Sequence, residues 1–197
     1  MGDDTELVER LQSGDERAFV ELVDRFHPSL LRLASTFVPN RAVAEEVVQD
    51  TWLGVVRGID RFEGRSSLRT WLFRILVNRA RTAGSRERRS TPVDLTAEPA
   101  VPSERFGSGG QWRDPPAPWS DDAEDRIVAQ LTVERISAWL GELPEMQRQV
   151  VLMRDFEGLP SAEVCELLGL SDVNQRVLLH RARSRIRGML ERELGKG

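Results

Sequence analysis

Polar and aromatic residues recur at three- and four-residue spacing between positions 71 and 85. On a helix they would form one stripe: Trp71, Arg74, Asn78, Arg81 and Ser85. Arginine neutralises phosphate, while an aromatic ring and an amide can contact a base lifted out of a duplex. The stripe therefore indicates nucleic-acid binding. It also fits an ordinary solvated helix face with Trp71 on its edge.

A helix that begins after Ser67 must position this stripe. The Ser67 hydroxyl can accept a hydrogen bond from the free N–H groups of the first turn. Apolar residues within one arc predict the packed face: Leu68, Leu72, Ile75 and Leu76. Arg79 falls inside this arc, so its side chain must extend outward or the helix must fray there.

The composition is that of a soluble globular protein with one large or two small domains, at 197 residues, 40% hydrophobic and 30% charged. No run approaches the roughly 18 apolar residues of a membrane span, and the acidic N-terminus lacks a signal-peptide core, so we expect a cytoplasmic protein without membrane insertion. Cys165 is the only cysteine, and His27 and His180 are far apart. With no catalytic or metal-binding motif either, we expect no enzyme activity, no metal and no cofactor.

Charge is unevenly distributed around a net value of −4. Arginines gather at 74–89 and 176–192, while 114–125 is acidic. A weak net charge does not exclude nucleic-acid binding when basic residues cluster.

Apolar spacing predicts an all-α N-terminal part. A short first helix ends at residues 13–15, a second carries Ala18 to Phe26, and Pro28 is expected to open a further one. Residues 41–59 form the next helix, and its packed side is Ala44, Val47, Val48, Thr51, Trp52, Val55, Val56 and Ile59. Its opposite side holds Glu46, Gln49, Asp50, Leu53 and Arg57. An apolar residue in a charged stripe marks a partner-binding surface, or it is a stray leucine on a solvated face.

Residues 90–123 read as an extended linker rich in proline and glycine. Trp112 and Trp119 within it could dock on a partner or fold back onto a domain.

The C-terminal part, 124–197, is predicted to be helical. A short helix begins at 160–162 and ends at the Gly169 turn, and a long one follows from about Asp172 to Leu194, which is the order of a helix-turn-helix. Cys165 is expected to be a buried structural thiol. On the long helix the expected outward residues are Arg176, Val177, His180, Arg181 and Arg187, with Arg183 beside them. Such a face suits DNA, although a basic amphipathic helix of a small bundle would look alike.

Taken in order, these parts resemble the extracytoplasmic-function (group 4) sigma factors of bacterial RNA polymerase. The motifs that carry the resemblance are AEEVVQDTW from Ala44, FEGRSSLRTWLFRILVNRAR from Phe62, LPEMQRQVVLMRDFEGLPSAEVCELLGL from Leu143, and RVLLHRAR from Arg176. The resemblance implies region 2 at 1–89, a linker at 90–123 and region 4 at 124–197. It departs at Asn174 and Gln175, where the family usually has Thr-Val, and Gln175 falls on the inward arc.

The resemblance also implies roles for these residues. The residues implied to bind the clamp coiled coil of the largest polymerase subunit are Glu46, Gln49, Asp50 and Leu53. Those implied to capture the minus-ten element are Phe62, Arg65, Ser66, Trp71, Arg74, Asn78 and Arg81. Those implied to read the minus-thirty-five element are Arg176, Val177, His180, Arg181 and Arg183. The implied partners are core polymerase, promoter DNA and an anti-sigma factor.

The expected function is promoter-specific transcription initiation for a stress or envelope-signal regulon. Two alternatives stay open at this point. A free-standing repressor or activator would use only 143–190 and bind DNA without polymerase. An enzyme that acts on nucleic acid would need a carboxylate cluster or metal-ligand spacing, which the sequence does not show.

Overall fold

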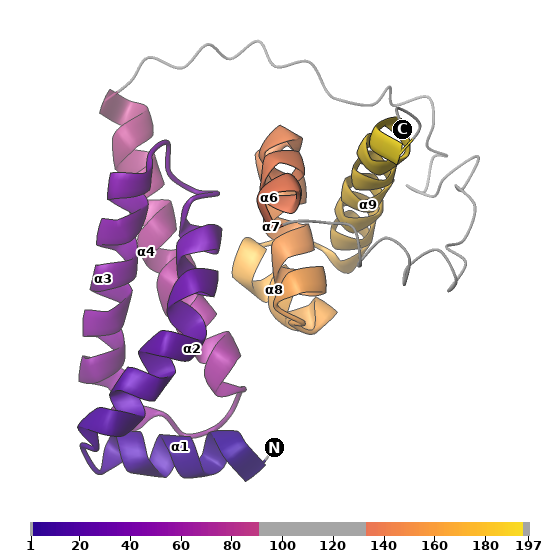
Figure 1. Cartoon of the computed structure of the whole chain (residues 1–197). Coiled ribbons are helices and arrows are strands. Elements are labelled where there is room, and N and C mark those ends of the chain that lie inside the picture. Colours follow the sequence, from indigo (N-terminus) through magenta and orange to yellow (C-terminus); the bar gives the residue numbers. More distant parts are fainter. Residues whose placement is uncertain (1, 91–132, 195–197) are drawn as a thin grey trace. The chain divides into compact units, whose positions relative to one another are not determined.

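The computed structural model describes residues 2–90 and 133–194, and over these residues every regular element is a helix (Figure 1). The all-α prediction is therefore confirmed. The helices of the N-terminal part are α1 (Gly2–Gln12), α2 (Glu16–Ala34), α3 (Arg41–Gly58), the 3₁₀ turn η1 (Ile59–Arg61) and α4 (Leu68–Ser90). Those of the C-terminal part are α6 (Val133–Glu142), α7 (Glu145–Val151), the π-helical turn η3 (Leu152–Phe156), α8 (Ser161–Leu168) and α9 (Asp172–Leu194).

Contacts group these helices into two compact units. The first holds α1 to α4 with η1, and also η3 and α8, while the second holds α6, α7 and α9. The predicted linker with Trp112 and Trp119, and the expected start of a helix at Glu124, lie outside the described residues. The domain boundaries drawn from the sequence remain a prediction.

The core of the first unit lies among α2, α3 and α4, and α1 runs across the end where α2 begins (Figure 1). Fully buried side chains recur at helical spacing on all three: Leu22, Phe26, Leu30 and Leu33 on α2, Val48 and Val55 on α3, and Leu72, Phe73, Leu76 and Val77 on α4. Burying a side chain of this size stabilises the fold by about 1.5–3 kcal/mol. This packing fixes which faces of α3 and α4 remain accessible.

Pro28 does not open a new helix, so that expectation was wrong. Helix α2 continues from Glu16 to Ala34 with Pro28 inside it. Proline removes one N–H donor and normally disfavours the helix interior. Here Phe26 and Leu30, on either side of it, are both almost completely buried, and this packing holds the helix continuous.

Two burial expectations also need correction. Val56 was expected on the packed side of α3, but it is 55% exposed. Buried positions on α3 end at Val55, and Val56 lies on the edge of their arc, where it lines an open surface pocket with Val20 of α2. Cys165 is a free thiol that is half-buried and not fully enclosed.

Side-chain caps and one glycine set the helix ends as the sequence indicates. The Thr70 N–H donates to Ser67 Oγ at 3.0 Å, which confirms the predicted cap of α4. The Val43 N–H donates to Asn40 Oδ1 at 2.9 Å at the start of α3. Helix α8 ends at Gly169, whose φ of 67° is favourable only for glycine, and α9 begins three residues later. The predicted order of short helix, glycine turn and long helix is therefore present.

Gly84 on α4 gives a test of this packing. A Cβ atom built there would lie 2.5 Å from the backbone carbonyl oxygen of Phe37, which cannot move aside as a side chain could. Gly84→Ala should therefore lower the free energy of unfolding by roughly 1–3 kcal/mol, even though alanine favours helix. Urea unfolding followed by circular dichroism measures the change.

Gly188→Ala on α9 is the matched control, since nothing lies within 4 Å of its Cβ position. It should leave stability unchanged or raise it by up to about 1 kcal/mol. Equal midpoints for Gly84→Ala and the unaltered chain would contradict the close approach of α4 to Phe37.

Candidate functional site

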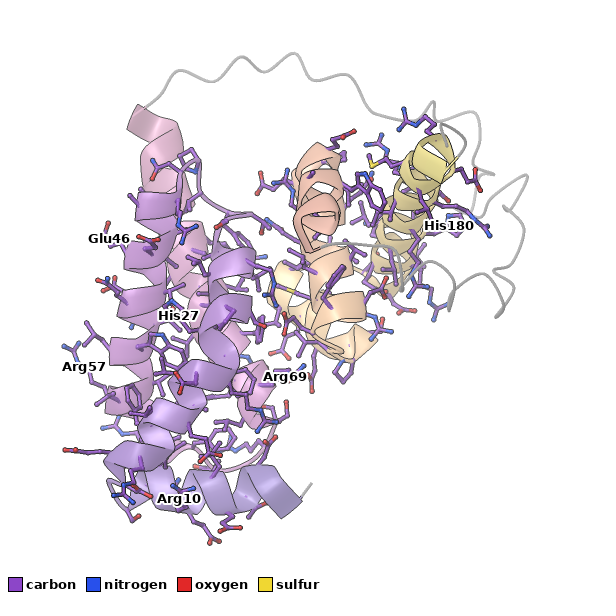
Figure 2. The ribbon with its side chains drawn as sticks, viewed as in Figure 1. Arg10, His27, Glu46, Arg57, Arg69 and His180 are labelled. Atoms are coloured by element: carbon purple, nitrogen blue, oxygen red, sulfur yellow. The ribbon has the colours of Figure 1, made fainter. Side chains whose placement is uncertain are left out.

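The outward side of α3 carries an exposed stripe, which we call the α3 stripe. Its members follow one another at helical spacing: Glu46, Gln49, Asp50, Leu53 and Arg57. Figure 2 shows Glu46 and Arg57 along the outer edge of α3. Leu53 is 52% exposed and lies between acidic and basic neighbours. The structure thus brings together the four residues implied to bind polymerase, although their role remains a prediction.

The rotational setting of α3 follows from its buried side. Trp52 is 9% exposed, its indole N–H donates to Nδ1 of His27 on α2 at 3.3 Å, and its ring meets Phe19 edge to face at 5.9 Å. The fully buried Thr51 hydroxyl donates to the Val47 carbonyl at 2.8 Å. An indole N–H that leaves water needs an acceptor, so turning α3 would strand it. The α3 stripe is therefore held outward by contacts on the opposite side of the helix.

Arg79 extends outward and α4 continues through it, so the first of the two sequence expectations is confirmed. The guanidinium crosses to α3, where Nη1 lies 3.8 Å from Oδ2 of Asp50. Gly54 leaves the space for this, because a Cβ atom there would lie 2.7 Å from Arg79 Nη2. Arg79 was not among the site residues predicted from the sequence. Its position inside an apolar arc was the sequence feature that could have indicated it.

A groove of about 670 Å³ runs between α3 and α4 beside this contact. Its α3 wall includes Glu46 and Asp50, and its α4 wall includes Asn78, Arg79 and Thr82. Residues implied to bind polymerase and a residue implied to bind DNA therefore line the same groove.

The loop before α4 and the first turns of that helix are tied together by aromatic and amide contacts. The Phe62 and Trp71 rings lie 5.2 Å apart at 50°. The Gln12 side-chain N–H₂ of α1 donates to the carbonyls of Ile59 at 3.0 Å and Phe62 at 3.1 Å. Trp71 is half-buried, so it is a packing residue as well as a candidate for base contact.

The polar stripe of α4 lies as the spacing predicts. Asn78 and Arg81 are exposed, while Trp71 and Arg74 are half-buried. Arg74 Nη2 lies 2.9 Å from Oε1 of Glu166 on α8, within the first unit. In the preceding loop Ser66 is half-buried, and Arg65 is exposed and donates to Glu63 at 2.7 Å. Arg74 and Arg65 therefore already have carboxylate partners, which a phosphate would have to replace.

On α9 the implied DNA-contact residues divide into two groups. Arg176 and Arg183 are exposed, while Val177, His180 and Arg181 are half-buried. Arg176 Nη2 lies 2.6 Å from Oδ2 of Asp172, one turn earlier. Gln175 is 1% exposed, in agreement with its expected inward direction.

Burial and nearby positive charges lower the pKa values of two basic side chains on this helix. The pKa of His180, labelled in Figure 2, is lowered first by burial and then by the nearby charge of Arg183. The pKa of Arg181 is also lowered, by burial and then by Arg185, yet it starts from a value high enough to keep its charge. The lowered pKa favours the neutral form of His180, an imidazole that carries one donor and one acceptor.

Residues 2–90 and 133–194 hold neither a metal-binding cluster nor a membrane-spanning helix. No three His, Cys, Asp or Glu side chains there are grouped to hold a metal ion. No helix in the same ranges has the length and apolar character to cross a membrane.

Comparison with known families matches both parts of the chain. The family model described as Sigma-70 region 2 matches residues 22–90, and the one described as Sigma-70, region 4 matches residues 134–186. The ECF RNA polymerase sigma-E factor of Escherichia coli (strain K12) is 32% identical over 186 residues, covering 93% of this chain and 92% of that protein. The RNA polymerase sigma-H factor of Pseudomonas aeruginosa is 34% identical over 184 residues, covering 93% and 91%.

Two solved structures share the fold. CnrH, solved in complex with the cytosolic domain of CnrY, has a TM-score of 0.57 at 24% identity and covers 95% of this chain and 97% of its own. The sigma factor RpoE of Bartonella quintana, solved with the anti-sigma factor NepR, has a TM-score of 0.59 at 22% identity and covers 88% and 96%. With two family models in chain order and relatives above 30% identity along nearly its whole length, the chain belongs to the sigma-70 family, among the ECF RNA polymerase sigma factors.

Proposed function

We propose that this chain binds the core of bacterial RNA polymerase and directs transcription initiation at particular promoters. One observation carries the proposal. This chain, which matches both sigma-70 family models, has an exposed acidic and apolar stripe on α3 and basic, polar stripes on α4 and α9. The first suits a protein partner, and the other two suit nucleic acid. The polymerase makes the RNA, and this chain catalyses no reaction itself.

The proposed polymerase contact is the α3 stripe. Leu53 is the candidate anchor, since an exposed apolar side chain gains most when a partner covers it. Glu46 and Asp50, in the turns before it, supply negative charge that would select a basic group on the partner and speed association.

The proposed DNA contacts lie on two separate helices. Asn78 and Arg81, with Trp71 and Phe62 behind them, would hold an unpaired base and its phosphate at the minus-ten element. Arg176, His180 and Arg181 of α9 would read the minus-thirty-five element in the major groove, with Arg183 on phosphate.

Neither DNA contact needs to be strong alone. When polymerase holds the first part, the second acts at a raised effective concentration, so affinity depends on the assembled complex. Capture of a flipped base would offset part of the few kcal/mol that unstacking it costs.

The cellular setting follows from this role. We propose that the chain acts in the cytoplasm, where promoter DNA and polymerase are, and that an anti-sigma factor regulates it, as the resemblance to the group implies. A stress or envelope signal would set the regulon.

In vitro transcription with core polymerase over a promoter library tests the proposal as a whole. A mobility-shift assay with and without core separates it from a free-standing regulator. Tight, specific binding of the chain to promoter DNA without polymerase would refute the proposed role.

The first prediction concerns Leu53. Leu53→Asp should weaken binding to purified core polymerase by about tenfold or more, because it places a charge where the anchor is buried. A pull-down or an equilibrium binding assay measures this. Val20→Asp is the matched control, since Val20 is 57% exposed on α2 and lies outside the α3 stripe. Unchanged affinity of Leu53→Asp would remove α3 from the interface.

The second prediction concerns Asn78. Asn78→Ala should reduce the fraction of open complexes several-fold, in keeping with about 1–3 kcal/mol for a base contact, while protection of the upstream element persists. Permanganate reactivity of unpaired thymines reports opening, and a footprint on the same complexes is the internal control. Equal reactivity with and without the substitution would count against base capture by α4.

A further inference from the structure

Beside the α3 stripe, on the edge of α3 that faces α4, Gly54 leaves a gap that a side chain of α4 fills. Gly54 stands four residues after Asp50, so a side chain there would lie next to Asp50 on the edge of α3 that faces α4. The guanidinium of Arg79 occupies that space, 2.7 Å from where a Cβ atom of residue 54 would be. An arginine of α4 thus takes the place of a side chain on α3.

The neighbours of Arg79 on α4 lie in the core. Leu76, Val77 and Ala80 are almost fully buried, and Ile75 Cγ2 lies 3.1 Å from the Gly54 Cβ position. The Arg79 side chain is 35% exposed, with Nη1 3.8 Å from the Asp50 carboxylate.

Fold stability alone does not account for this arrangement. Glycine in a helix interior is unfavourable, and so is an arginine within an apolar arc. Asp50 is 55% exposed, and an ion pair this long and this exposed stabilises a fold little. Each feature is costly locally, and together they deliver a positive charge to the outer face of α3.

We propose that Arg79 is part of the polymerase-binding surface, reaching it through the opening at Gly54. This rests on the proposed function of the α3 stripe. Along α3 the stripe then runs from acidic (Glu46, Asp50) through apolar (Leu53) to basic (Arg57), and Arg79 adds a positive charge beside Asp50. Arg41, the basic residue at the acidic end, is paired with Glu45 at 2.8 Å.

A surface with one charge sign at each end selects the direction of its partner. The matching segment of core polymerase presents a basic side chain to Glu46 and carboxylates to Arg79 and Arg57. Reversing that segment would place like charges together at both ends. Arg57 sets the orientation, and Arg79 is a specificity-determining residue because it requires a carboxylate next to the basic group that meets Glu46.

The test measures equilibrium binding of the full chain to purified core polymerase, without DNA, at several salt concentrations. Arg79→Leu should bind about threefold more weakly and Arg79→Glu about tenfold more weakly, with a shallower salt dependence. Gly54→Leu should match Arg79→Leu, because its side chain displaces the guanidinium while the arginine remains. The double variant with Gly54→Leu and Arg79→Leu should bind core polymerase only slightly more weakly than either single variant.

The decisive variant places the positive charge on α3 itself. Gly54→Arg combined with Arg79→Leu should restore affinity to within about twofold of the unaltered chain, which a merely structural role of Arg79 would not produce. Arg17→Glu is the charge-matched control, because Arg17 is exposed on α2, away from the stripe, and should leave binding unchanged. Circular dichroism shows whether each variant is folded. If Arg79→Leu does not fold, the affinity of Gly54→Leu tests the proposal in its place.

The outcomes separate the two proposals. If Leu53→Asp loses binding while Arg79→Glu and Gly54→Leu bind as well as or better than the unaltered chain, the inference about Arg79 is wrong and the α3 interface stands. If Gly54→Arg combined with Arg79→Leu does not recover affinity for core polymerase, the inference is also overturned. If the unaltered chain does not bind core, both proposals fall.

Discussion

The burial of Trp52 between α3 and α2 is the constraint on which the proposed polymerase surface depends. Its ring is excluded from water, and its one polar atom has a partner in His27. An unsatisfied indole N–H in this position would cost about 1–3 kcal/mol, so α3 has one favourable rotation. The outward positions of Glu46, Asp50 and Leu53 follow from that rotation.

The same logic connects α3 to α4. Because the two helices pack along their length, a vacancy on one becomes accessible to a side chain of the other. Gly54 and Arg79 make use of this, and the groove beside them places Asn78 close to Glu46 and Asp50. Contacts proposed for polymerase and for the minus-ten strand therefore line opposite walls of one groove.

Much of the fold could be predicted from the sequence, because apolar spacing and caps are local signals. The exposed face of α3, the Ser67 cap and the span of α9 all depend on residues within a few turns. Pro28 and Val56 could not be assigned in this way, since packing against neighbouring helices decides both. The path of Arg79 depends on an absent side chain 25 positions earlier, a relation that periodicity within one helix does not contain.

The two hydrogen bonds of the Gln12 amide extend the functional part of the chain beyond its family match. That match begins at residue 22, yet Gln12 satisfies the carbonyls of Ile59 and Phe62, at the entrance to the loop before α4. A fragment cut at residue 22 would retain every residue proposed to touch polymerase or DNA. It would nevertheless leave both carbonyls to water, so α1 holds the start of the loop that we propose binds the minus-ten strand.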